Sequence, residues 1–223
     1  MKGLVIAIDG PSGAGKSTIA KLLSRRLGYT YIDTGALYRA IGWKARQEGV
    51  DPTDEHVLAA LCSRVDVRLR YENGSQRVSV DGADVTDAIR TPEMGMIAST
   101  VSKSPAVRAR LLIIQRSLGE QGSVVMDGRD IGTVVFPDAD VKFFLDASAA
   151  ERGRRRWREL KDKGMDVDVN VITAEITARD LQDSGRDIAP LKQASDAAYV
   201  DSSTMTIEQV VDRLMSEIER RSL

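Results

Sequence analysis

The sequence of 223 residues has only one cysteine, Cys62, only one histidine, His56, and no long apolar run. A single cysteine excludes an internal disulfide and a zinc site built from several cysteines, which agrees with a reducing compartment. The apolar start is too short for a secretory signal, and no stretch approaches the length of a membrane span. We therefore expect a cytoplasmic protein with no membrane association. We also expect His56, in the polar stretch DPTDEHVLAAL, to be exposed.

Charge of either sign is not in excess. The chain has 32 lysines and arginines and 33 aspartates and glutamates, for a formal net charge of −1. Such a balance gives no general attraction to nucleic acid or to a membrane surface, so any basic site must be local. The length is that of one domain. We expect a monomer that binds small molecules and no nucleic acid.

Glycine, in contrast, is concentrated in the stretch GPSGAGKST, where its conformational cost needs a reason. The spacing Gly10, four residues, Gly15-Lys16-Ser17 is the phosphate-binding P-loop pattern, in which bare N–H groups converge on an anion at a helix N-terminus. In that pattern Lys16 reaches the β- and γ-phosphates, and the Ser17 hydroxyl can ligate magnesium. The expected ATP-binding residues are Gly10, Pro11, Ser12, Gly13, Ala14, Gly15, Lys16, Ser17 and Thr18.

The residues on either side of this loop have the order that a P-loop needs. Leu4 to Ile8 is a short aliphatic run, as expected of a buried parallel strand. After the loop, Ile19, Leu23 and Leu27 recur at helical spacing. A flexible surface turn requires neither neighbour, so we favour phosphate binding over that alternative.

Strand-like and helix-like segments alternate along most of the chain, which predicts an open, doubly wound parallel sheet of the α/β class. Alternating apolar and polar residues around Asn73-Gly74 predict an inserted antiparallel hairpin at about Val65 to Val85. Further strands are expected at 29–33, 123–128, 141–147 and 197–203. Helices are expected from Thr34, as N-cap, and at 51–62, 94–101, 106–118, 148–163, 170–184 and 207–221.

Charged residues follow two of the predicted strands, at the sheet edge where ligands bind in open α/β folds. Thr34 and Arg39 offer a hydroxyl and a guanidinium to a second phosphate, but these residues alone favour an ordinary N-cap with an exposed arginine. Asp127 is placed to hold magnesium through water, and Arg129 to clamp a phosphate. The alternative for this pair is a tight polar turn.

The run ERGRRRWR, residues 151–158, is costly as a plain surface helix. Like charges at i, i+4 cost about 0.2–0.5 kcal/mol for each pair, and Glu151 and Glu159 offset only part of this. An arginine-rich lid that closes over phosphates explains the run, with Arg155 and Arg156 as its candidate phosphate ligands. Nucleic-acid binding is the alternative, which the near-neutral total charge disfavours.

Together these motifs resemble the bacterial cytidylate kinases, a family of nucleoside monophosphate kinases. The resemblance covers nearly the whole chain. It rests on IDGPSGAGKST, DTGALYR, IRTPEMGMIAS, DGRDIGTVVFPDA, KFFLDAS with the arginine run, and ARDLQDSGRDIAPL. It implies transfer of the γ-phosphoryl group of ATP, with Mg²⁺, to CMP or dCMP. It also implies one P-loop kinase domain over 1–223, with a CMP-binding region at 34–103, its β insertion near 65–85, and a lid at 150–165.

The resemblance also implies roles for individual residues. Ser99, Arg108 and Asp130 correspond to contacts with cytosine and the nearby sugar, and Arg179 and Asp183 to ribose contacts. Arg39, Arg129 and Arg186 correspond to phosphate ligands. Ser17 stands where many members have glycine, which leaves open whether its hydroxyl ligates the metal directly. Transfer itself is then assigned to Lys16, Arg129, Arg155 and Arg156.

Three other functions are compatible with a P-loop. The first is a kinase for a different small acceptor, such as UMP or a metabolite, against which Asp130 and Arg108 argue. The second is a GTP-dependent switch, but the sequence has no guanine-reading Asn-Lys-x-Asp motif. The third is a nucleic-acid-dependent ATPase that uses the arginine run.

Overall fold

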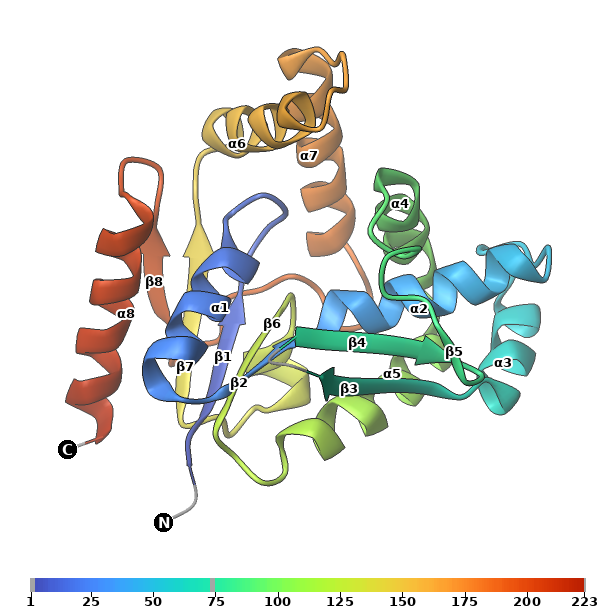
Figure 1. The fold of residues 1–223 in the computed structure, drawn as a ribbon, viewed down its shortest axis with the longest axis horizontal. Coiled ribbons are helices and arrows are strands. Elements are labelled where there is room, and N and C mark those ends of the chain that lie inside the picture. The colour runs from blue at the N-terminus through green and yellow to red at the C-terminus, as the bar shows by residue number, and fades with distance from the viewer. Residues whose placement is uncertain (1–2, 73–74, 223) are drawn as a thin grey trace. The chain divides into compact units, whose positions relative to one another are not determined.

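Short apolar segments form a parallel sheet in the computed structural model, which describes residues 3–72 and 75–222. The sheet has the order β2-β6-β1-β7-β8 (Figure 1). β1 pairs in parallel with β6 and β7, and β7 pairs in parallel with β8. The predicted parallel α/β architecture is confirmed. The strands are β1 (Val5–Asp9), β2 (Thr30–Asp33), β6 (Val124–Gly128), β7 (Val141–Asp146) and β8 (Ala198–Asp201).

The chain divides into two units, one made of the described residues up to Tyr31 and from Gln121 on, the other of Ile32–Glu120. In the first unit, apolar side chains of β1, β7 and β8 form one core with α1 and α8. All five residues of β1 are buried, as expected of a central strand of a parallel sheet that is covered on both faces. Its helices are α1 (Lys16–Leu27), η1 (Ile131–Val135), α6 (Ala149–Asp162), α7 (Val169–Ser184) and α8 (Ile207–Ser222).

The second unit joins four helices to a separate antiparallel sheet of order β3-β4-β5. Val67, Leu69, Val78 and Val80 are buried on one face of that sheet, while their neighbours are more exposed. The predicted antiparallel insertion is therefore confirmed, although its turn at 73–74 lies outside the described residues. The elements are α2 (Thr34–Gln47), α3 (Glu55–Arg64), β3 (Val67–Glu72), β4 (Ser75–Val80), β5 (Ala83–Asp84), α4 (Pro92–Val101) and α5 (Pro105–Gly119).

Two helix starts differ from the sequence prediction because an aspartate carboxylate caps the backbone. Thr34 is not the N-cap of α2, since Asp33 accepts a hydrogen bond from the N–H of Ala36 and Thr34 is the first helical residue. α3 begins at Glu55, not at Asp51, because Asp54 caps it. The Asp51 carboxylate accepts from Thr53 and so stabilises a turn before the helix.

The π-helical turn η1, directly after Asp130, has no signal in the sequence pattern and was not predicted. His56 is exposed on α3, as expected. Within the described residues, no helix has the length and apolar character needed to cross a membrane.

Candidate active site

The P-loop glycines adopt backbone angles that other residues avoid. Gly10, Gly13 and Gly15 have φ values of 148°, 77° and 89°. A Cβ atom on Gly10 would lie 2.0 Å from the carbonyl oxygen of Leu145, so this position has no room for a side chain. Gly15 is the N-cap of α1 in the left-handed conformation. The loop therefore turns directly into a helix N-terminus, the geometry that presents N–H groups to an anion.

Lys16 is buried at this helix start. Its Nζ donates a hydrogen bond of 2.7 Å to the carbonyl oxygen of Pro11 within the loop. Burial, aided by the positive charge of Arg129, lowers the pKa of Lys16 to about 7, although the carboxylates Asp127 and Asp9 act in the opposite direction. A bound polyphosphate would supply negative charge and so stabilise the protonated form of the Lys16 amine.

Asp127, at the end of β6, is held by two hydroxyl groups. The Ser17 Oγ donates to Oδ2 of Asp127 at 2.9 Å, and the Tyr31 hydroxyl donates to Oδ1 at 2.9 Å. Hydroxyl and carboxylate oxygens fit a magnesium ion that also takes phosphate oxygens and water. No group of three or more histidine, cysteine or acidic side chains suited to a metal occurs among the described residues. The predicted pair Ser17 and Asp127 is thus brought together, while Tyr31 was not predicted.

Asp9 is a further carboxylate that the sequence analysis missed. It ends β1, is buried, and accepts hydrogen bonds from the N–H groups of Ile131 at 2.8 Å and Gly132 at 2.7 Å. Burial raises the pKa of Asp9 to about 7, although both N–H groups favour the charged form. Asp9 therefore links the P-loop to the turn that carries Asp130. An acid at the end of an apolar strand was the signal that identified Asp127, and it applied equally here.

Three residues that were predicted to contact phosphate or ribose, Asp183, Arg129 and Arg186, form one ion-paired group. Asp183 on α7 accepts from Nε of Arg129 at 3.0 Å and also pairs with Arg186, while its own side chain is 1% exposed. Asp130 is buried at the start of η1, and Arg179 lies on the same helix as Asp183. In this structure Asp183 orients two arginines, a role that the sequence analysis did not assign to it.

In the second unit, α2 carries two of the predicted residues and packs against α4 and α5. Arg39 forms an ion pair of 2.7 Å with Asp33, and its buried Nε has no hydrogen-bond partner among the described residues. Arg108 on α5 is buried and donates to the Tyr38 hydroxyl at 3.0 Å. Its guanidinium carbon lies 5.6 Å from the centre of that ring. Thr34 on α2 and Ser99 on α4 are also buried. Tyr38 was not predicted, although it lies within DTGALYR.

The arginine run forms α6 with more compensation than its sequence indicates. Glu151 pairs with both Arg154 and Arg155, and Glu159 pairs with Arg156. Arg152 is buried and pairs with Asp180 of α7, which is distant in sequence. An acid on another helix thus adds to the partial compensation by Glu151 and Glu159 that the sequence indicates.

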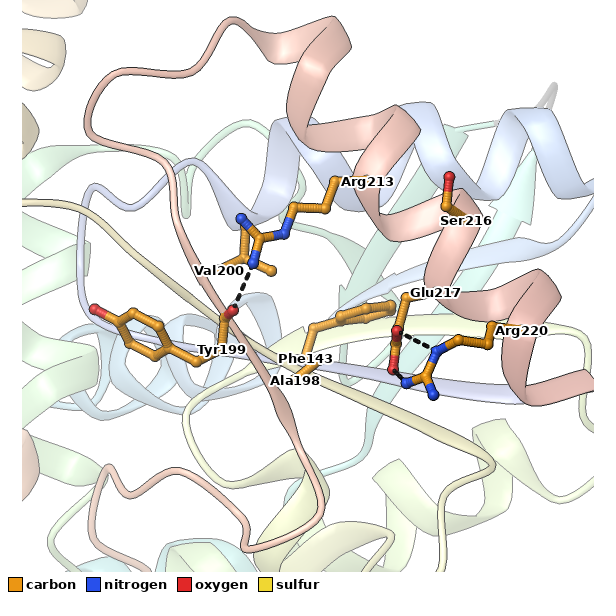
Figure 2. Close-up of a pocket in the computed structure, with 8 residues that line it drawn as sticks. All are labelled: Phe143, Ala198, Tyr199, Val200, Arg213, Ser216, Glu217 and Arg220. Atoms are coloured by element: carbon orange, nitrogen blue, oxygen red, sulfur yellow. Dashed lines mark hydrogen bonds and ion pairs between the residues drawn. The ribbon is translucent and has the colours of Figure 1, made fainter.

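A separate hollow of about 390 Å³ lies between α8 and the edge strand β8 of the first unit (Figure 2). Arg213, Glu217 and Arg220 of α8 line it together with Tyr199. None of its lining residues belongs to the P-loop or to the arginine cluster around Asp183. It is therefore not the phosphate site.

Comparison with known proteins gives the family of the chain. A family model described as cytidylate kinase matches residues 6–220. The chain belongs to the cytidylate kinase family. A cytidylate kinase from Syntrophotalea carbinolica is 52% identical over 218 residues, which cover 98% of this chain and 93% of the relative. One from Bacillus subtilis is 48% identical over 221 residues, which cover 99% of each protein.

The fold is also found outside this family. A solved shikimate kinase from Acinetobacter baumannii, in complex with shikimate, matches with a TM-score of 0.50 at 14% identity. The match covers 99% of this chain and 96% of that one. At this identity the likeness shows a common fold alone, which is the predicted P-loop kinase architecture.

The buried carboxylate of Asp9 predicts a specific dependence of stability on pH. A pKa raised from 3.8 to about 7 means that the folded protein binds a proton between these values and the unfolded chain does not. This contribution to the free energy of unfolding falls as pH rises through that range. Asp9→Asn removes it, so the stability of the variant relative to the wild type should increase as pH rises from about 4.5 to about 7.

Urea unfolding at several pH values measures this difference. The matched control is Asp162→Asn, at an exposed position at the end of α6, which removes a carboxylate away from the buried site. A constant difference for Asp9→Asn across the range would contradict the assignment.

Proposed function

We propose that the protein transfers the γ-phosphoryl group of ATP to CMP or dCMP. The observation that carries the proposal is the buried Lys16 at the helix start of a complete P-loop, in a chain that belongs to the cytidylate kinase family. Curated relatives at about half identity bear that family name. The family supports CMP as the acceptor, and the P-loop supports ATP as the donor.

On the donor side, the N–H groups of the loop and Lys16 hold the phosphates of ATP. Lys16 exchanges its bond to the Pro11 carbonyl for phosphate oxygens, which restores its full positive charge. Ser17 and Asp127 would hold magnesium, which would supply positive charge to the phosphates of ATP. Tyr31 keeps the second oxygen of Asp127 occupied and so fixes the direction of the first.

On the acceptor side, arginines bind the phosphate of CMP and polar groups read the base. Arg39, Arg129 and Arg186 are the phosphate ligands, and Asp183 orients two of them. The unsatisfied Nε of Arg39 supports this assignment, because a buried donor without a partner is costly until a ligand accepts from it. Arg179 and Asp183 contact the ribose, with Thr34 at the start of α2. Ser99, Arg108 and Asp130 contact the base.

Transfer needs little from the protein beyond positioning and electrostatic stabilisation, because the transition state is loose and in line. Arg155 supports a lid role through its place beside the P-loop, where its Nη1 lies 3.5 Å from the carbonyl oxygen of Ala14. Closure of the lid at 150–165 over the phosphates excludes water and prevents hydrolysis of ATP. We place this reaction in the cytoplasm, in a monomer that uses small-molecule substrates and no nucleic acid.

Lys16→Ala tests the donor site. Loss of one contact to transition-state charge lowers kcat by about 10²–10³-fold, and burial of an alanine leaves the fold intact. The measurement is steady-state turnover with ATP, magnesium and CMP, together with thermal unfolding. Lys192→Ala, at an exposed lysine, is the matched control and should behave as the wild type. Near-normal turnover by a folded Lys16→Ala protein rejects the P-loop assignment.

Neutralising Arg155 and neutralising Arg156 should have different effects on the melting temperature. Arg156 pairs only with the partly exposed Glu159 in the described contacts, so Arg156→Gln should lower kcat while the melting temperature stays unchanged. Arg155 also donates to the carbonyl oxygen of Ser202 at 2.6 Å, so Arg155→Gln should lower both. Arg154→Gln on the same helix is the control. Unchanged turnover in both lid variants would show that the run is structural.

Asp130→Ala tests how the base is read. A carboxylate accepts from the amino group at position 4 of cytosine but repels the carbonyl that uracil has there. A site built on such a buried polar group discriminates by up to about 10⁴–10⁵-fold. The variant should lose kcat/KM for CMP far more than for UMP, which narrows the ratio between them. An unchanged ratio means that Asp130 does not read the base; Asp138→Ala, at an exposed position, controls for general effects.

A further inference from the structure

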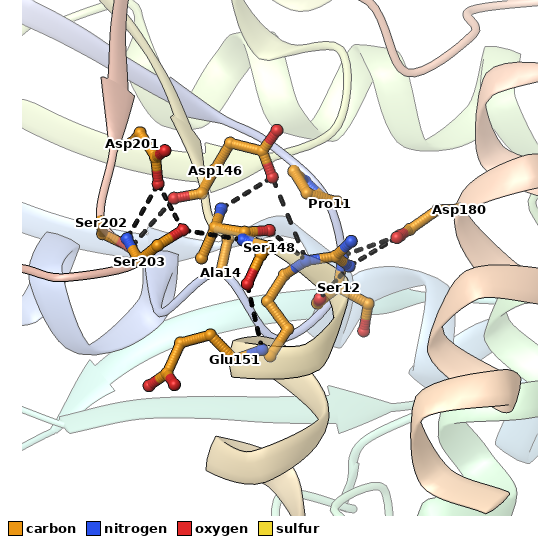
Figure 3. A network of polar contacts seen from close by, with 12 residues as sticks. Pro11, Ser12, Ala14, Asp146, Ser148, Glu151, Asp180, Asp201, Ser202 and Ser203 are labelled. Atoms are coloured by element: carbon orange, nitrogen blue, oxygen red, sulfur yellow. Dashed lines mark hydrogen bonds and ion pairs between the residues drawn. The ribbon is translucent and has the colours of Figure 1, made fainter. Parts of the chain in front are cut away.

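An ion pair outside the phosphate-binding loop holds the backbone of Ser12. The N–H of Ser12 donates to Oδ1 of Asp180 at 3.3 Å (Figure 3). The carbonyl oxygen of Ser12 accepts from Nη1 of Arg152 at 2.9 Å. The same Nη1 donates to Oδ2 of Asp180 at 2.5 Å. Both polar backbone groups of one P-loop residue are therefore bound by one arginine–aspartate pair.

This pair is largely removed from water. The side chain of Arg152 is 8% exposed and that of Asp180 is 18% exposed. Nε of Arg152 donates to the carbonyl oxygen of Ala147 at 2.8 Å, just after β7. Burying two charges costs desolvation free energy, which apolar side chains of similar volume do not cost. The ion pair therefore need not stabilise the folded protein. Its directional hydrogen bonds to the loop indicate a geometric role.

The neighbouring residues bring the pair against the loop. A Cβ atom on Gly153 would lie 2.0 Å from Oγ1 of Thr173, so the glycine allows α6 and α7 to pack closely enough for Arg152 and Asp180 to meet. A Cβ atom on Gly13 would lie 3.1 Å from Cβ of Arg152, which places α6 directly against the loop. The two helices and the loop therefore meet at Arg152 and Asp180.

We infer that Arg152 and Asp180 are positioning residues that fix the P-loop, through Ser12, in its phosphate-binding shape. The inference deepens the proposed function and rests on its ATP site. Arg152 is thereby separated from Arg155 and Arg156, which are the proposed phosphate ligands of the lid. Asp180 lies on the helix that also carries Asp183, so α7 contributes to the geometry of the donor loop as well as to the acceptor site.

The main test is the double variant Arg152→Met/Asp180→Leu, which removes both charges together and leaves no unpaired buried ion. Its direct readout is the Kd for ATP, measured by calorimetry on the full chain, beside the Kd for CMP. We expect the Kd for ATP and kcat to worsen by on the order of 10–100-fold, since a small displacement of a positioning group has effects of this size. The Kd for CMP and the melting temperature should stay near wild type.

A matched control neutralises an exposed ion pair of the same unit. Arg26 and Asp212 have side chains that are 47% and 65% exposed, and Arg26→Gln/Asp212→Asn should leave the Kd for ATP unchanged. The isosteric variant Asp180→Asn provides a second test that does not depend on the double variant folding. It keeps the side-chain shape but replaces one acceptor oxygen with a donor, so the Kd for ATP should again rise selectively.

If the double variant folds and its Kd for ATP equals that of the wild type, the inference is overturned. If the double variant does not fold, a wild-type Kd for ATP in Asp180→Asn overturns it. Equal losses of ATP and CMP binding, with a lowered melting temperature, also overturn it, because they show a general structural role. ATP binding is measured without transfer. A wild-type protein that binds ATP but does not phosphorylate CMP therefore rejects the proposed acceptor and leaves this test valid.

Discussion

The site depends on an amino group that is buried before any phosphate is bound. Lys16 has lost most of its hydration and donates to a carbonyl oxygen of its own loop, while Arg129 opposes its charge. A neutral partner compensates an ammonium group only partly. The polyphosphate of ATP supplies the missing negative charge, and the same constraint explains why carboxylates such as Asp127 and Asp9 are gathered nearby.

A loop with this task must be held rigidly, because its glycines have little conformational preference of their own. The described contacts hold it from several directions. Asp9 ties the strand before it to the turn after β6, and the ion pair of Arg152 and Asp180 ties Ser12 to α6 and α7. Tyr31 fixes Asp127 from β2. Most of these partner side chains are polar and buried, so their hydrogen bonds form in one specific arrangement.

Much of the fold follows from local patterns in the sequence. The strand before Gly10, the glycine angles, the helix after Lys16 and the antiparallel insertion all depend on residues close together in the chain, and these predictions are confirmed. The N-cap of α2 was wrong because Asp33 and Thr34 are both good caps and adjacent. The choice depends on which side chain reaches the N–H of Ala36.

Contacts between distant residues account for what the sequence pattern did not predict. Arg152 and Asp180 are 28 residues apart, on α6 and α7, and no local pattern in the sequence pairs them. Asp9 and Tyr31 lie in strands and Tyr38 in a helix, and nothing local marks any of the three as a partner of a distant side chain. The site residues implied by the family resemblance fall into both units, and their individual roles remain proposals.

The acceptor preference of the wild-type protein tests the central claim most directly. Initial rates of ADP formation with CMP, dCMP, UMP, AMP and GMP, at fixed ATP and magnesium, give kcat/KM for each. The account predicts that CMP or dCMP has the highest value and that UMP and the purine nucleotides have far lower ones. A preference for any other acceptor, or ATP hydrolysis that no acceptor stimulates, would contradict it.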